Sequence, residues 1–144
     1  MLMLLASSVA LAASAPVHSA EITHPARAYR ATWAAQPVVH FRQVNPLAAM
    51  RQVHPMCRWS AQLTVNRAVA SNGAAVPAMD KAVHSFRPVS GVQVGRCEDQ
   101  QRAIAAEVAR YSDALSGEAA DVARRDHGAL RAELDSFHAL APRG

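Results

Sequence analysis

The chain contains little glycine and none of the local patterns by which common enzyme classes are recognised. Its six glycines among 144 residues are too few for a glycine-rich phosphate-binding loop. The absence of His-Glu-x-x-His argues against a zinc hydrolase, and the absence of Gly-x-Ser-x-Gly argues against a serine hydrolase. Only two acidic residues precede Glu98, so few carboxylates are available in that part of the chain to form a catalytic pair. The sequence therefore favours a non-catalytic protein without a cofactor.

Aromatic residues and lysine are also scarce. Aromatics make up 5% of the chain although 51% is hydrophobic, because alanine supplies much of the apolar content, so the core must pack small side chains closely. One basic residue is lysine and fourteen are arginine. Residues 21–97 contain nine basic and two acidic residues, a net charge of +7, whereas residues 98–144 contain six and nine, a net charge of −3. Such a split indicates either a surface that meets anionic partners or two halves that attract each other.

The first twenty residues have no charged side chain and are rich in leucine and alanine. This pattern predicts an export signal over residues 1–20, cleaved near Ala20, although small residues also allow cleavage after Ala12 or Ala15. The basic residues that normally begin such a signal are missing, and an ordinary apolar helix or an uncleaved anchor is the alternative. No other segment is apolar over the roughly 20 residues needed to cross a membrane. We therefore expect a periplasmic or secreted protein with no transmembrane segment after cleavage.

Residues 21–56 are interrupted by proline at intervals that exclude a long helix. The prolines of this segment are Pro25, Pro37, Pro46 and Pro55. Residues 38–44 predict one short strand, and residues 46–52 predict a helical turn. We expect the segment to be partly flexible, above all in the first dozen residues after the cleavage site.

Residues 57–69 alternate between apolar and polar side chains, which predicts a strand with one buried and one wet face. The side chains expected in the core are those of Trp59, Ala61, Leu63, Val65 and Val69. Arg67 interrupts this apolar series near the end of the strand, where we expect its charged head to reach water. Asn72-Gly73 predicts a hairpin turn, and a return strand over residues 82–87 completes a hairpin over residues 57–89.

After Cys97 the apolar residues recur every three or four positions, which is typical of helices. We expect helices over about 98–115 and 118–140, and the short link between them predicts an antiparallel αα-hairpin. The expected fold is an α+β domain over residues 57–144. In it, a small two- or three-stranded antiparallel sheet built on the β-hairpin is packed by the C-terminal αα-hairpin.

The two cysteines lie at corresponding places in this expected fold. Cys57 opens the strand and Cys97 directly precedes the first helix, so both lie at the same end of the sheet. In an exported protein they predict a disulfide, which would close a loop of about 40 residues and stabilise the fold by roughly 4 kcal/mol. A redox or nucleophilic thiol is the alternative, but the Cys-x-x-Cys spacing is missing.

Soft metal ligands and histidines are present without a specific spacing. Four residues that would suit copper lie close together in sequence: Met50, His54, Met56 and Cys57. Oxidation of Cys57 would remove it from such a set, and ordinary loop residues are the preferred interpretation, so we assign no metal site. His127 and His138 are expected to be solvated helix residues.

Arginines on or beside the expected strands are the candidate contacts for a partner. They are Arg42, Arg58, Arg67 and Arg87, with Arg96 close by. Guanidinium groups match phosphate and carboxylate geometry, which indicates an anionic partner. Nucleic acid is not expected, because aromatic side chains for base stacking are missing among these arginines and Trp59 is predicted to face the core.

The favoured hypothesis is an exported, non-catalytic interaction module whose arginine-bearing sheet face contacts an anionic envelope component or a partner protein. One alternative is a small metal-handling protein or enzyme of the envelope built around His54 and Met56. Another is a structural accessory subunit that buries its helix face against a second chain.

Overall fold

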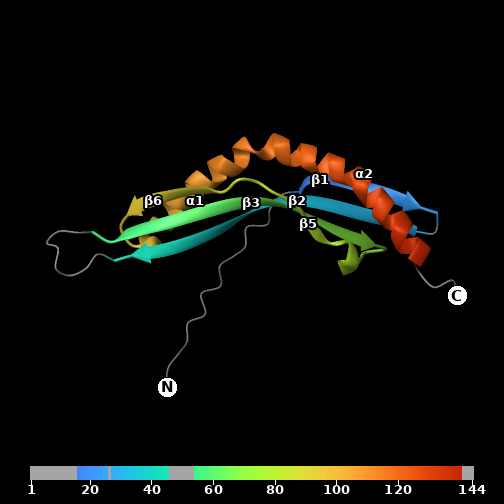
Figure 1. Cartoon of the computed structure of the whole chain (residues 1–144), viewed down its shortest axis with the longest axis horizontal. Helices are drawn as coiled ribbons and strands as arrows, with labels where there is room; N and C mark the ends of the chain where they lie inside the picture. The colour runs from blue at the N-terminus through green and yellow to red at the C-terminus, as the bar shows by residue number, and fades with distance from the viewer. Residues whose placement is uncertain (1–15, 26, 46–53, 141–144) are drawn as a thin grey trace, which may run out of the picture.

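Two long strands that run the length of the molecule form the axis of the fold. The structure is a computed structural model that describes residues 16–25, 27–45 and 54–140. Its elements, in chain order, are β1 (Pro16–His24), β2 (Arg27–Val44), β3 (Met56–Ser71), β4 (Ala74–Ala75), a 3-10 turn (Pro77–Met79), β5 (Lys81–Ser85), β6 (Val89–Val94), α1 (Cys97–Ala114) and α2 (Ser116–Leu140). The six strands form one antiparallel sheet, and both helices lie on one side of it (Figure 1). The α+β class is thus confirmed.

The sheet is larger than the two or three strands that the sequence predicted. β2 pairs with β3 from Arg30–Ala70 to Val44–Met56, and β1 pairs with the first half of β2. β4, β5 and β6 share the other edge of β3. The predicted strand over residues 38–44 is only the end of β2, and the predicted helical turn over residues 46–52 lies outside the described residues.

Pro37 lies within β2 without ending it. β1 begins at Pro16, opposite Ala34, so among the described residues β2 pairs only with β3 beyond that point and is an edge strand, where proline is tolerated. β1 also includes residues that the sequence assigned to the leader. Cleavage after Ala20 would remove the first half of β1, whereas cleavage after Ala15 would leave it whole.

β3 has the predicted alternation of buried and exposed side chains. All its odd-numbered positions from Cys57 to Ser71 are buried, and none of its even-numbered positions is. The side chains predicted for the core are therefore confirmed there. The hairpin turn is confirmed as well, because Asn72 and Gly73 have positive φ angles of 52° and 78°.

The two helices do not form the antiparallel αα-hairpin that the sequence predicted. They follow each other end to end along the sheet and are joined only by Leu115 (Figure 1). Leu115 keeps a near-helical conformation, with φ −95° and ψ 0°, and its carbonyl accepts a hydrogen bond from the N–H of Ala119 at 2.9 Å. A one-residue break of this kind bends a helix instead of reversing it. Gly117, which we expected in the link, lies inside α2.

Each helix covers its own part of the sheet and closes its own core cluster. Under α1, the cluster consists of Cys57, Trp59, Ala61, Ile104 and Val108. The larger cluster lies under α2 and includes Trp33, Leu63, Val65, Leu130 and Leu134. Among the described residues, no helix is long and apolar enough to span a bilayer.

Cys57 and Cys97 form the predicted disulfide, with their Cα atoms 4.8 Å apart. The bond joins the beginning of β3 to the beginning of α1. Because Cys57 is oxidised, it offers no thiolate to a metal.

Candidate anion-binding site

The side of the sheet away from the helices, here called the open face, carries the even-numbered residues of β2 and β3. None of these positions is buried. The odd-numbered residues of β3 face the helices. An arginine at an even-numbered position of β2 or β3 therefore lies on the open face, whereas one at an odd-numbered position of β3 faces the helices.

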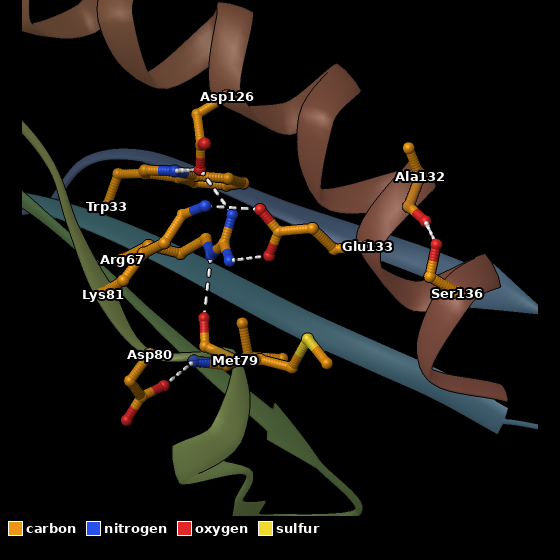
Figure 2. Close-up of polar contacts among 10 residues, drawn as sticks. Trp33, Arg67, Met79, Asp80, Lys81, Asp126, Ala132, Glu133 and Ser136 are labelled. Carbon is orange, nitrogen blue, oxygen red and sulfur yellow. Dashed lines mark hydrogen bonds and ion pairs between the residues drawn. The ribbon is translucent and has the colours of Figure 1, made fainter. Parts of the chain in front are cut away.

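Arg67 lies on the helix side and is a structural residue, contrary to the expectation that its head reaches water. Its side chain is 0% exposed, and Figure 2 shows its guanidinium between the strands and α2. Nε donates to the carbonyl of Met79 at 3.0 Å, and one terminal nitrogen donates to Asp126 at 2.9 Å. The other terminal nitrogen contacts Glu133 at 2.5 Å. These contacts occupy the guanidinium, so Arg67 does not belong to a site for an external ligand.

The same network includes residues that sequence reasoning did not connect. Asp126 Oδ2 also accepts a hydrogen bond from Trp33 Nε1 at 2.8 Å, and Lys81 Nζ lies 2.5 Å from Glu133. Partial burial raises the pKa of Glu133, but hydrogen bonds and charges from Lys81 and Arg67 outweigh it, so this pKa lies below its ordinary value. The partners lie 59 and 66 residues from Arg67 in sequence, so no local pattern could have revealed them.

Arg42 and Arg58 are the two predicted contact residues that the fold brings together. They form a directly opposed pair on the open face, where β2 and β3 meet. Like charges directly opposite each other are unfavourable in a sheet unless an anion lies nearby. Within the described residues, neither guanidinium makes a hydrogen bond or an ion pair. Arg30, on the same face toward the other end, is instead paired with Glu21 at 2.7 Å.

The next opposed pair on the open face adds two further polar groups. His40 lies opposite Ser60, immediately beside the Arg42–Arg58 pair. These four residues line a shallow hollow of about 230 Å³, together with Phe41 and Trp59. Two guanidinium groups, an imidazole and a hydroxyl can all donate hydrogen bonds to one phosphate or carboxylate group. The arrangement can bind an anion.

The remaining predicted residues lie elsewhere. Arg87 lies in the connection between β5 and β6, where its carbonyl accepts a hydrogen bond from Tyr111, and Arg96 forms an ion pair with Glu98. No cluster of three or more histidine, cysteine or acidic side chains that could hold a metal occurs in the part of the chain that the structure describes. Of the suggested copper ligands, Cys57 is in the disulfide and Met50 lies outside the described residues.

Two histidines that we expected to be solvated pack instead between α2 and the sheet. His138 Nε2 lies 2.8 Å from the hydroxyl of Tyr29, and its ring stacks on that of His24 at 4.1 Å. His127 packs against Trp33, with ring centroids 5.9 Å apart. The sequence prediction missed these contacts because it placed no strand at β1 or at the first part of β2, where Tyr29 and Trp33 lie.

No known protein family, curated protein or solved structure matches this chain. The geometry of its own residues therefore carries the functional argument.

Proposed function

We propose that this chain is an exported, non-catalytic interaction module that binds an anionic component of the cell envelope through Arg42 and Arg58. The observation that carries the proposal is the direct opposition of two exposed arginines without a partner among the described residues. Their mutual repulsion is relieved when an anion lies between them. A bound phosphate or carboxylate would thus satisfy a charge arrangement that the fold leaves uncompensated.

The charge distribution of the open face supports this proposal. Among the described strand residues on that face of β1, β2 and β3, the one acidic side chain is Glu21, and it already pairs with Arg30. Residues 21–97 carry a net charge of +7, which would attract an anionic surface over a longer range. The Cys57–Cys97 disulfide is compatible with an oxidising compartment and so with export.

The alternative functions have less support. A metal-handling role would rest on His54 and Met56 without the thiolate of Cys57, which is in a disulfide. A structural accessory subunit would use an exposed apolar surface, and the helices offer Phe137 and Leu140 near the end of α2. Neither alternative accounts for the opposed arginines.

The double variant Arg42→Ala, Arg58→Ala tests the proposal by binding to dextran sulfate, a soluble polyanion. We expect its affinity to fall at least about tenfold, because each charge-assisted hydrogen bond contributes roughly 1.5–3 kcal/mol. The control is Arg30→Ala, which removes one charge from the same face at a residue already paired with Glu21. A free-energy loss for Arg30→Ala at least half that of the double variant would match the number of charges removed, assign the binding to overall charge and overturn the proposed site.

A further inference from the structure

We infer that the anionic component is the surface of an anionic phospholipid bilayer, which the end of the open face enters with a row of apolar side chains. This inference rests on the proposed function and names its partner. Its basis is the order in which apolar, basic and polar residues follow one another across three neighbouring strands.

Strand pairing places residues of β2, β3 and β6 side by side in rows across the open face. The last row, here called the apolar row, contains Val44, Met56 and Val94. The next, the basic row, contains Arg42, Arg58 and Val92. The third, the polar row, contains His40, Ser60 and Ser90. Polarity thus changes in a fixed order from the end of the sheet inward.

The two valines that β6 contributes to these rows are open to solvent, whereas Val44 and Met56 are half-buried. Val94 is 66% exposed and Val92 is 54% exposed, which is unusual for valine in a sheet. A solvated ligand such as a polysaccharide would gain nothing from these side chains, whereas a bilayer would remove them from water. The exposed valines therefore favour a lipid surface over a purely ionic partner.

The spacing of the rows matches the depth profile of a bilayer surface. Successive same-face rows are about 7 Å apart, because a strand rises about 3.3 Å per residue. Peripheral elements bury their apolar side chains about 5–10 Å into the boundary between headgroups and acyl chains. With the apolar row at that depth, Arg42 and Arg58 would lie among the lipid phosphates. The acidic residues at this end of the molecule, such as Glu98 and Glu107, belong to α1 on the other side of the sheet.

A depth measurement on the full chain tests this arrangement. Val94→Trp introduces a fluorophore in the apolar row, and Leu140→Trp introduces one at the far end of α2, where Leu140 is 85% exposed. Each protein is mixed with vesicles of phosphatidylglycerol and phosphatidylcholine whose acyl chains carry bromine, a fluorescence quencher. The natural chain, whose buried Trp33 and Trp59 also fluoresce, gives the background in each measurement. We expect quenching above this background for Val94→Trp, none above it for Leu140→Trp, and none above it for either on phosphatidylcholine alone. Equal quenching at the two positions would overturn the inference.

Two sets of variants separate the role of the charges from that of the valines. Adding Arg42→Ala and Arg58→Ala to Val94→Trp should weaken vesicle binding about twenty-five-fold, since each arginine near an anionic surface contributes about fivefold. Val92→Ser with Val94→Ser should lose vesicle binding but retain binding to dextran sulfate. The matched control for lost apolar surface is Phe137→Ser with Leu140→Ser, which should bind vesicles normally.

The outcomes distinguish this inference from the proposed function. If the arginines are needed for dextran sulfate but no vesicle quenches Val94→Trp, the bilayer is excluded while anion binding stands. An acidic protein or polysaccharide would then be the partner. If removing Arg42 and Arg58 changes neither measurement, both conclusions fail.

Discussion

The two ends of this sheet are stabilised in different ways. At the disulfide end, α1 packs on a small cluster around Trp59 and is joined to β3 by the Cys57–Cys97 bond. At the opposite end, α2 is held by the buried contacts of Arg67 with Asp126 and Glu133. One end thus depends on a covalent link and the other on a buried ionic network.

The two faces of β3 also differ, and this difference explains why two arginines of the same strand have different roles. Arg58 and Arg67 both lie in β3, but an even-numbered position faces the open side and an odd-numbered one faces the helices. Arg67 meets two carboxylates and becomes part of the core, whereas Arg58 meets Arg42 and stays available. The face of the strand, together with what lies opposite, decides whether an arginine is structural or available to a ligand.

The largest expected effect comes from breaking the ionic network. Arg67→Met removes the guanidinium but leaves Asp126 buried beside Trp33 without a positive partner. We expect the free energy of unfolding to fall by about 3–5 kcal/mol, as for other buried pairs that lose one member. Denaturant unfolding measures this loss.

The second variant of this experiment is Arg67→Met combined with Asp126→Leu, which removes both charges. We expect the double variant to recover part of the lost stability, because no buried charge then lacks a partner. A loss below about 1 kcal/mol for Arg67→Met alone would contradict the structural role of Arg67.

Breaking the disulfide end should cost a similar amount. Cys57→Ala with Cys97→Ala opens a loop with a sequence separation of 40 residues, for which the chain-entropy estimate is about 4 kcal/mol. Reductant should lower the stability of the natural chain by a similar amount and have no effect on the double variant. Thiol alkylation with mass analysis checks the starting state, and two free thiols in the protein isolated from its native compartment would refute the bond.

A pair of glycine substitutions should change the two ends in opposite directions. A Cβ atom at Gly91 would lie 2.7 Å from the indole nitrogen of Trp59, so Gly91→Ala should cost about 1–3 kcal/mol by overpacking the smaller cluster. Nothing lies within 4 Å of a Cβ at Gly128 in α2, so Gly128→Ala should stabilise that helix by about 0.5–1 kcal/mol. Thermal unfolding of both variants tests this opposition, and destabilisation by Gly128→Ala would contradict it.

Local periodicity was enough to predict the parts of the fold that depend on neighbouring residues. The alternation along β3 and the Asn72-Gly73 turn follow from short stretches of sequence. The disulfide, with a sequence separation of 40, was predicted instead from the places of the two cysteines in the expected fold. The two helices were predicted as well. Their relative direction depends on the backbone conformation of Leu115, which the sequence of the expected link does not reveal. β1 was missed because its residues resemble the end of a leader.

The candidate site was predicted only in part, for a related reason. Arginines on strands were recognisable as a group, but their separation onto two faces requires the register between β2 and β3. That register places Arg42 opposite Arg58, 16 positions later in the sequence. Periodicity indicates on which face of a strand a side chain lies, but only the tertiary structure identifies the residue opposite it on the neighbouring strand.

The smallest expected effect concerns the pH dependence of the ionic end. The lowered pKa of Glu133 means that the folded chain favours its carboxylate more than the unfolded chain does. Its contribution to stability is therefore present above the ordinary value of 4.5 and is lost as the pH falls through the lower, folded value. Because Glu133 is about one-third exposed, we expect less than about 1 kcal/mol. The free energy of unfolding of Glu133→Gln, measured between pH 3 and 6, should lack this pH-dependent contribution. The control is Glu107→Gln, which alters a carboxylate at the disulfide end whose partner is the uncharged Gln93. An identical pH profile for Glu133→Gln and the natural chain would exclude a role of this charge in holding α2.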